Sequence, residues 1–427
     1  MNIEKLHSLY LNCSNACTDT RQIQKNNMFF ALKGPNFNGN KYAEEAIKKG
    51  ALYAVVDEEK YLKNNDRIIL VDNVQKALQQ LATYHRNFLG LKILSLTGSN
   101  GKTTTKELIN AVLSKKYNTV ATKGNLNNHI GVPLTLLSMN KNTEFGIVEM
   151  GANHLKEIET LCSITHPDYG YITNFGKAHL EGFGSVEGVI KGKTELYDYL
   201  INNDKTVFCN ANDSIQIQKL KDYKKKFCFG SDISVDVKII QKKSNNANVT
   251  VWVEDVIIES QLIGNYNFTN IASAICIGKH FNIPLNKIKE AIEGYVPTNN
   301  RSQLIIKDNK KIVMDAYNAN PSSMKAALDN FASLPDANKI IFLGDMFELG
   351  ETSFEEHQFI SEYASHQRFN EIFLIGENFY KTENSKAKKF KTFTDFETFI
   401  KSYNVREGII LIKGSRGMAL ERILPLI

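Results

Sequence analysis

The sequence has no uninterrupted apolar run of the length that a membrane-spanning helix needs, and it is poor in cysteine, proline and tryptophan, with 6, 8 and 1 residues among 427. The N-terminal stretch MNIEKLHSLYLNCSNAC also lacks the long apolar core and the small-residue cleavage site of a signal peptide. Six scattered cysteines do not suggest a disulfide framework and are expected to be ordinary thiols. These absences argue against membrane insertion and predict a cytoplasmic protein.

Charge is also modest, because 52 Lys and Arg residues against 46 Asp and Glu residues leave a net charge of +6. The excess is compatible with anionic substrates, but it is too diffuse to indicate a nucleic-acid partner. The lysine-rich runs KDYKKKF (221–227) and KTENSKAKKFK (381–391) are most simply solvated faces. We therefore expect a chain that binds no nucleic acid.

The order of apolar runs predicts an α/β protein of three domains, since the chain is too long for one ordinary core. Residues 1–85 alternate short apolar runs with turn signals, as in a small α/β domain. Residues 86–298 alternate β-rich and helical runs, which predicts a mostly parallel sheet with helices on both faces. Within them VDVKIIQ, ANVTVWV and VIIESQLIG add an antiparallel β subregion. After the Pro- and Asn-rich segment GYVPTNNRSQ, residues 299–427 resume the alternation and predict a Rossmann-like domain.

The stretch LSLTGSNGKTTTKELI, residues 94–109, has the pattern of a buried strand, a glycine-bearing turn and a helix start. Backbone N–H groups in such a turn form an anion site, where Lys102 can neutralise phosphate charge and the Thr103 hydroxyl can bind Mg²⁺. The common phosphate loop has four residues between its first glycine and GK, whereas only two separate Gly98 from Gly101. An ordinary strand–helix turn is the less typical alternative. Hydrolysis, phosphate transfer, motor work and ligation all use loops of this kind.

Two further residues are candidate metal ligands. Glu149 ends the predicted strand of IVEMGAN, at the sheet edge where ligands bind. We therefore favour Glu149 as a second ligand, beside Thr103, for the same Mg²⁺ ion. His179 lies in the glycine-rich NFGKAHLEGFGS, where a lone histidine is equally well explained as a hydrogen-bonded loop residue.

A lysine stands on an apolar helix face. Ser185 is a predicted N-cap of a helix through VEGVIKGKTELYDYL. Helical spacing puts four residues of that helix on one face: Val189, Lys193, Leu196 and Leu200. A buried lysine is costly unless it is paired, neutralised or modified, although a side chain that snorkels to solvent is the simpler explanation.

The stretch TGSNGKTTT resembles the shortened loop of the Mur ligases, the ATP-dependent amide-bond ligases of peptidoglycan assembly, and the resemblance covers nearly the whole chain. It implies that ATP phosphorylates a substrate carboxylate and that an amine then displaces the phosphate. KGKTEL resembles the family segment whose lysine is carbamylated by CO₂, here Lys193, so that the carbamate binds a second Mg²⁺ with His179. The loop residues implied to contact ATP are Gly98, Ser99, Asn100, Gly101, Lys102, Thr103 and Thr104.

Other segments extend the resemblance. TDTRQIQKNNMFFALKGPNFNG resembles the uridine-nucleotide-binding domain of the two later enzymes of the series, and GNYNFTNIASA resembles the adenine-side motif. MDAYNANPSSM, LGDMFELG and KGSRGMALE are similar to the members that add the terminal dipeptide. The further nucleotide contacts implied are Asn267, Asn270, Arg301 and Asp315. The substrate contacts implied are Asn125, Asn127 and Asn128, for which loop capping is the alternative, and Tyr317, Asn318, Asn320 and Lys413.

The resemblance thus implies a monomeric enzyme that acts on UDP-MurNAc-tripeptide and D-alanyl-D-alanine with ATP and two Mg²⁺ ions. Lys102, His179 and Lys193 are its implied catalytic residues, and Thr103 and Glu149 complete the implied metal ligands. Three alternatives stay open. They are a sister ligase that adds a single amino acid, a phosphate-loop NTPase that drives a conformational switch, and a nucleotide-binding scaffold without activity.

Overall fold

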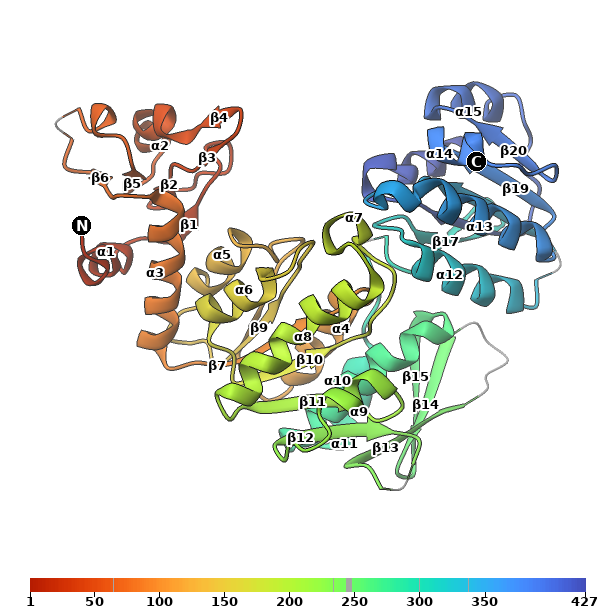
Figure 1. The fold of residues 1–427 in the computed structure, drawn as a ribbon, viewed down its shortest axis with the longest axis horizontal. Helices are drawn as coiled ribbons and strands as arrows, with labels where there is room; N and C mark the ends of the chain where they lie inside the picture. The colour runs from red at the N-terminus through yellow and green to blue at the C-terminus, as the bar shows by residue number, and fades with distance from the viewer. Residues whose placement is uncertain (64, 233, 243–247, 299, 337) are drawn as a thin grey trace.

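The computed structural model describes residues 1–427 except 64, 233, 243–247, 299 and 337, and it folds the chain around three successive α/β sheets (Figure 1). The predicted α/β class is confirmed. Ala247, the first residue of ANVTVWV, and Asn299, the first residue of the predicted C-terminal domain, lie outside the described residues. Along the described chain, no helix combines the length and the apolar character needed to cross a bilayer.

The N-terminal sheet is small and parallel, with strand order β1–β2–β5–β6, and β3 and β4 form a separate antiparallel hairpin. Its strands are β1 (Ala16–Cys17), β2 (Met28–Phe30), β3 (Lys33–Gly34), β4 (Phe37–Asn38), β5 (Tyr53–Val56) and β6 (Ile68–Leu70). Its helices are α1 (Ile3–Tyr10), α2 (Ala43–Lys48) and α3 (Val74–Leu89). Helix α3 leads from this sheet to the central one (Figure 1). It ends because Gly90 takes the left-handed conformation of a helix C-cap, with φ 62°.

The described residues of the central part form a nine-stranded sheet of order β15–β14–β13–β12–β11–β10–β7–β9–β8. The strands from β8 to β13 are parallel, and β14 is antiparallel to both of its neighbours, β13 and β15, as in the predicted antiparallel subregion. The strands are β7 (Lys92–Thr97), β8 (Thr119–Ala121), β9 (Phe145–Glu149), β10 (Tyr169–Ile172), β11 (Thr206–Asn210), β12 (Lys226–Gly230), β13 (Val237–Lys242), β14 (Asn248–Val253) and β15 (Val256–Ile263).

Helices cover both faces of this sheet, which is why strands such as β9 are buried along their whole length. One apolar core gathers α3 with α5 (Gly131–Leu137), α6 (Glu157–Thr165) and α8 (Val186–Asn202). The other gathers α4 (Lys102–Leu113), α10 (Phe268–His280) and α11 (Leu285–Glu293). The short helices α7 (Leu180–Phe183) and α9 (Ser214–Lys219) complete this part, and α7 lies on the side that faces the C-terminal sheet (Figure 1).

The C-terminal sheet has the order β16–β17–β21–β18–β19–β20, and it is parallel except for β16. Its strands are β16 (Gln303–Lys307), β17 (Lys310–Asp315), β18 (Lys339–Gly344), β19 (Glu371–Ile375), β20 (Ala387–Phe390) and β21 (Ile409–Lys413). Its helices are α12 (Pro321–Ser333), α13 (Ser353–His366), α14 (Glu377–Lys381) and α15 (Phe393–Ile400). Apolar cores on both faces make it a second doubly covered α/β sheet.

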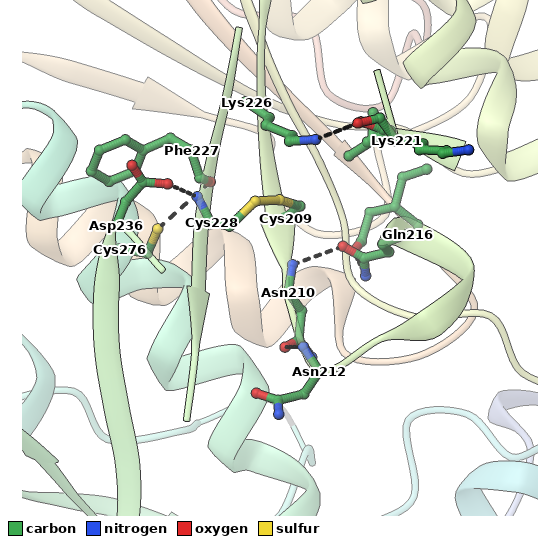
Figure 2. The surroundings of a disulfide bond; sticks show 12 residues. Cys209, Asn210, Asn212, Gln216, Lys221, Lys226, Phe227, Cys228, Asp236 and Cys276 are labelled. Carbon is green, nitrogen blue, oxygen red and sulfur yellow. Dashed lines mark hydrogen bonds between the residues drawn. A yellow bond between two sulfur atoms is a disulfide. The ribbon is translucent and has the colours of Figure 1, made fainter. Parts of the chain in front are cut away.

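One expectation about the cysteines is wrong. Cys209 of β11 and Cys228 of β12 are register partners on neighbouring parallel strands, with Cα atoms 4.6 Å apart, and they form a disulfide (Figure 2). Sequence spacing did not reveal the pair because strand pairing brings together residues 19 positions apart. The other four cysteines, Cys13, Cys17, Cys162 and Cys276, are free thiols as expected.

A buried histidine pair joins the N-terminal and central parts. His7 Nε2 of α1 lies 3.0 Å from His85 Nδ1 of α3, and His85 Nε2 lies 2.9 Å from the carbonyl oxygen of Met139. A carbonyl only accepts, so His85 Nε2 carries its proton and His85 Nδ1 accepts from His7. Burial lowers the pKa of both rings, and the neighbouring ring lowers that of His7 further. Both rings are therefore held neutral.

We expect this pair to make stability depend on pH. Because the folded-state pKa values lie below the unfolded ones, the stability that neutral rings contribute is present above about pH 6.5 and is lost as the pH falls. Replacing His85→Gln, which keeps a donor for Met139, should flatten the decline of Tm between about pH 7 and pH 5. Calorimetry of the variant, the wild type and the exposed-histidine control His366→Gln measures this. Parallel curves for all three proteins would contradict the assignment.

Candidate active site

A cleft of about 1010 Å³ lies between the central and C-terminal parts, where the carboxyl ends of β7 and β9 meet the segments after β17 and β18. All of the candidate catalytic, binding and metal-ligating residues named from the sequence line it except Gly98 and Lys193. Those that line it are Ser99, Asn100, Gly101, Lys102, Thr103, Thr104, Asn125, Asn127, Asn128, Glu149, His179, Asn267, Asn270, Arg301, Asp315, Tyr317, Asn318, Asn320 and Lys413. The fold therefore gathers segments from residue 99 to residue 413 into one cleft.

The phosphate loop is shaped by two glycines. Gly98 has φ 145°, and Gly101 has φ 78° as the N-cap of α4, a region that L side chains rarely adopt. A Cβ at Gly98 would lie 2.0 Å from Thr173 Oγ1, and a Cβ at Gly101 would lie 2.5 Å from Asn270 Oδ1. The loop thus needs glycine both for its conformation and for its close approach to neighbouring segments.

The lysine of the loop folds back onto it. Lys102 Nζ donates to the carbonyl oxygen of Gly98 at 2.7 Å. Burial lowers the pKa of Lys102, an effect that Arg301 reinforces and the carboxylates of Glu149 and Glu348 oppose. An anion bound in the loop would offer this ammonium a partner of opposite charge.

A hydroxyl and a carboxylate meet beside the loop, as predicted for a metal site. Thr103 Oγ1 donates to Glu149 Oε2 at 2.9 Å, and Asn127 Nδ2 donates to Glu149 Oε1 at 2.8 Å. Among the described residues, no group of three or more His, Cys, Asp and Glu side chains is placed to hold a metal. The pair nevertheless fits Mg²⁺, which is commonly bound through one or two carboxylates and completed by substrate phosphates and water.

The loop after β10 braces the phosphate loop, and sequence reasoning missed it. Asn174 Oδ1 accepts from the backbone N–H of Asn100 at 3.0 Å, and Thr173 Oγ1 donates to the Asn100 carbonyl at 2.6 Å. Ser99 Oγ donates to the carbonyl of Gly176 at 3.0 Å. The position of Asn174 could have identified this contact, because Asn174 lies in YGYITNF at the carboxyl end of a predicted strand in the same sheet.

The C-terminal part contributes the far wall. Lys413 Nζ lies 2.6 Å from Asp315 Oδ2 as a largely buried ion pair, and the Arg301 guanidinium lies 3.7 Å above the ring of Tyr317. Asn320 caps α12 and donates from Nδ2 to Asn100 Oδ1 at 2.8 Å. The buried Nε of Arg301 has no hydrogen-bond partner in the described part of the chain, so a donor is available for an anionic ligand.

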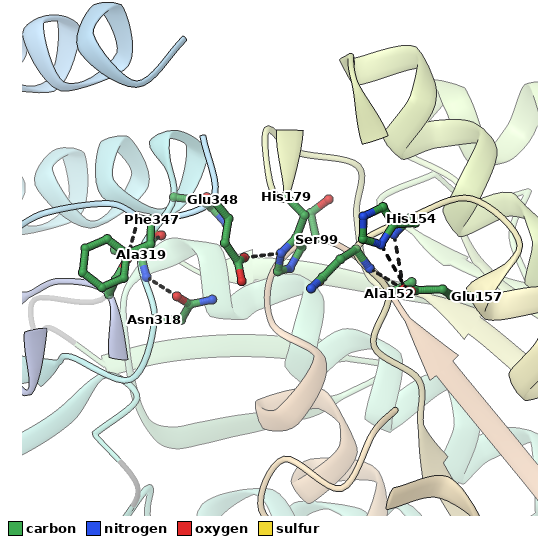
Figure 3. A network of polar contacts seen from close by, with 12 residues as sticks. Ser99, Ala152, His154, Glu157, His179, Asn318, Ala319, Phe347 and Glu348 are labelled. Carbon is green, nitrogen blue, oxygen red and sulfur yellow. Dashed lines mark hydrogen bonds and ion pairs between the residues drawn. The ribbon is translucent and has the colours of Figure 1, made fainter. Parts of the chain in front are cut away.

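His179 has a hydrogen-bond partner in the C-terminal part of the chain. His179 Nδ1 lies 2.5 Å from Glu348 Oε2, a carboxylate of the C-terminal part that sequence reasoning did not single out (Figure 3). Hydrogen bonding to His179 lowers the pKa of Glu348. Glu348 belongs to LGDMFELG, and its position soon after the predicted strand of KIIFLGD was the signal that could have found it.

Lys193 does not line the cleft and is fully buried on the apolar face of α8, whose N-cap is Ser185 as predicted. Its Nζ donates to the carbonyl of Ala152 at 3.0 Å and lies 5.0 Å from the centre of the Phe183 ring. Burial, with a contribution from Lys102, holds the pKa of Lys193 well below its usual range. The snorkelling alternative is therefore wrong, because the side chain does not reach solvent, and burial favours the neutral form of its amine.

These features are those of a phosphate-loop nucleotide-binding site in a cleft shared between two α/β domains. Three family models match successive parts of the chain. Residues 14–86 match the Mur ligase family catalytic domain, residues 96–278 match the Mur ligase middle domain, and residues 300–416 match the Mur ligase glutamate ligase domain. The chain belongs to the Mur ligase family.

Curated relatives and solved structures span nearly the whole chain. It is 33% identical to the UDP-N-acetylmuramoyl-tripeptide–D-alanyl-D-alanine ligase of Bacillus subtilis, over 95% of this chain and 91% of that protein. It is 31% identical to the Escherichia coli protein of the same name, over 95% and 92%. A MurF structure from Acinetobacter baumannii superposes with TM-score 0.86 at 26% identity, over 99% and 98%. The Thermotoga maritima MurF ligase in complex with ADP superposes with TM-score 0.84 at 25% identity, over 98% and 97%.

The glycine requirement gives a prediction for nucleotide binding. We expect Gly98→Ala to weaken ADP binding by more than about tenfold, or ~1.4 kcal/mol, because the added Cβ meets Thr173 in a strained backbone region. Titration calorimetry measures this. Gly90→Ala is the matched control, because Gly90 also has a positive φ but nothing lies within 4 Å of its Cβ. The control should lose about 1 kcal/mol of stability and keep its ADP affinity, whereas equal affinities for all three proteins would disprove the steric argument.

Proposed function

We propose that this chain is an ATP-dependent, ADP-forming ligase that joins D-alanyl-D-alanine to UDP-N-acetylmuramoyl-tripeptide. The observation that carries the proposal is its 31–33% identity, over 95% or more of its length, to curated proteins named for this reaction. The chemistry of the cleft agrees with it, because a phosphate loop, an asparagine-rich loop and the segment MDAYNANPSSM all line one cavity.

The three parts divide the work in this proposal. Residues 1–85 bind the uridine nucleotide, residues 86–298 hold the phosphates of ATP, and residues 299–427 supply the ribose and dipeptide contacts. We infer that the enzyme acts as a monomer. The nucleotide-linked precursor and ATP are substrates of the cytoplasm, where we place the reaction.

For the nucleotide, the loop N–H groups and Lys102 bind the phosphates, Asn267 and Asn270 lie on the adenine side, and Asp315 binds the ribose. Arg301 has a buried Nε available for phosphate, and this supports its assignment. Thr103 and Glu149 would hold Mg²⁺, which would supply charge neutralisation at the γ-phosphate. The Thermotoga maritima relative that binds ADP agrees with this use of the cleft.

For the ligation, Asn125, Asn127 and Asn128 orient the tripeptide so that its terminal carboxylate oxygen attacks the γ-phosphorus, and ADP leaves. Tyr317, Asn318, Asn320 and Lys413 orient the dipeptide, whose amine attacks the resulting acyl phosphate. The amine loses its proton, the new amide bond forms and inorganic phosphate leaves. The chain contributes positioning and electrostatic stabilisation, which dominate phosphoryl transfer, and closure of the cleft excludes water.

Lys193 fits the proposed carbamate chemistry. A neutral amine attacks CO₂ and releases one proton, which leaves a carbamate that can bind a second Mg²⁺ together with His179. Two observations support this role. The lysine is fully buried, and burial holds its pKa well below its usual range, which favours the neutral, nucleophilic form of the amine.

The reaction is tested by omitting substrates. With ATP, Mg²⁺, UDP-MurNAc-tripeptide and D-alanyl-D-alanine, we expect ADP release that requires both peptide substrates and a UDP-MurNAc-pentapeptide product identified by mass spectrometry. ADP release without either peptide would identify an NTPase. Turnover with a single amino acid in place of the dipeptide would identify a sister ligase.

The carbamate is tested at Lys193. We expect Lys193→Ala to lower kcat by at least about 100-fold, because the negative charge of the carbamate, a proposed ligand of the second Mg²⁺, is lost. Short carboxylic acids such as acetate should restore part of the activity by replacing the carbamate. Lys191→Ala on the same helix is the control, since Lys191 is exposed. A Lys193→Ala enzyme that keeps full activity, or one that folds but no small carboxylate rescues, would argue against the carbamate.

A further inference from the structure

The contact between His179 and Glu348 joins two parts of the chain that are 169 residues apart. His179 is the N-cap of α7 in the central part, and Glu348 lies in the loop after β18 in the C-terminal part. Both residues have left-handed backbones, with φ 53° and φ 62°. Residues other than glycine adopt this region rarely and at an energetic cost, and such positions cluster at functional sites.

The loop that carries Glu348 is anchored on both sides. The backbone N–H of Phe347 donates to Ser415 Oγ at 2.9 Å, and that of Met346 donates to His357 Nε2 at 3.0 Å. On the other side of the cleft, the carbonyl of Glu348 accepts from the backbone N–H of Glu181 at 3.4 Å. The backbone that leads to Glu348 is thus anchored in its own domain, and the carboxylate reaches His179 because the two domains are docked.

The chemistry of the pair determines where the imidazole proton lies. Glu348 is a carboxylate at neutral pH and can only accept, so the bond requires a proton on Nδ1 of His179. A neutral ring with a proton on Nδ1 has an unprotonated Nε2. No hydrogen bond reaches that atom from any residue that the structure describes, and His179 lines the cleft.

We propose that Glu348 is a positioning residue, which on domain docking fixes the proton of His179 on Nδ1 and leaves Nε2 as a ligand for a divalent cation in the cleft. The inference rests on the proposed function, which assigns His179 to the metal. Metal-binding histidines commonly donate their other ring N–H to a carboxylate, which fixes the tautomer and orients the ring. Here that carboxylate comes from another domain, so docking of the C-terminal domain would complete the ligand.

The tautomer of His179 can be read directly. In the full chain labelled with ¹⁵N-histidine, long-range ¹H–¹⁵N spectra distinguish the two tautomers, and the His179 signals are assigned by their loss in His179→Gln. We expect Nδ1–H in the wild type with ADP bound and a shift toward Nε2–H in Glu348→Ala. Glu348→Gln is isosteric and retains an accepting oxygen, so it should keep Nδ1–H.

Cation binding gives a second readout that needs no turnover. With ADP present, we expect Glu348→Ala to weaken Mn²⁺ binding, followed by the electron paramagnetic resonance of free Mn²⁺, by about 10- to 100-fold. Glu348→Gln should weaken it less. Glu351→Ala, which removes an exposed carboxylate three residues away, should match the wild type in both measurements.

Two results would overturn the inference. One is an Nδ1–H tautomer that persists in Glu348→Ala, and the other is Mn²⁺ affinity that does not change in that variant. Either result would mean that Glu348 only makes a contact between the two domains and does not position His179. Neither measurement uses a peptide substrate, so both can be made whether or not the ligation reaction occurs. A failure of this inference is therefore distinguished from a failure of the proposed function.

Discussion

The hydrogen bonds of Asn100 are the constraint on which the site depends. Its backbone N–H is bound by Asn174, its carbonyl is bound by Thr173, and its side chain accepts from Asn320 of the C-terminal part. One residue of the phosphate loop is thus hydrogen-bonded both to the segment after the neighbouring strand of its own sheet and to the next domain. These bonds hold in place the N–H groups that would face a phosphate.

The shortness of the phosphate loop explains why it is held so firmly. With two residues between Gly98 and Gly101, the loop has little freedom to adjust, and both glycines lie against other segments. The carboxyl end of β9 then brings Glu149 to Thr103, so that the first residues of α4 and the neighbouring strand form one polar site. Parallel strands make this possible because their carboxyl ends share an edge.

The cleft is formed by two domains, and each domain contributes charged side chains to it. Lys102 and Lys193 come from the central part and are deprived of solvent, whereas Glu348, Asp315 and Lys413 arrive from the C-terminal part. Only the docked arrangement places the Glu348 carboxylate near the lysine of the loop and against His179. A reaction that must exclude water gains from a site whose charges are complete only when the domains meet.

Local patterns in the sequence determined much of this protein. They gave the α/β class, the strand–turn–helix of the phosphate loop, the Ser185 cap and the buried face that holds Lys193, because helix and strand periods and turn chemistry depend on near neighbours. Tertiary structure alone decided the partners of those residues. The Cys209–Cys228 disulfide, the bond from Asn320 to Asn100 and the pairing of His179 with Glu348 join positions 19, 220 and 169 residues apart. Strand register and domain docking set these contacts, and both are determined by the packing of the whole chain rather than by any short stretch of it.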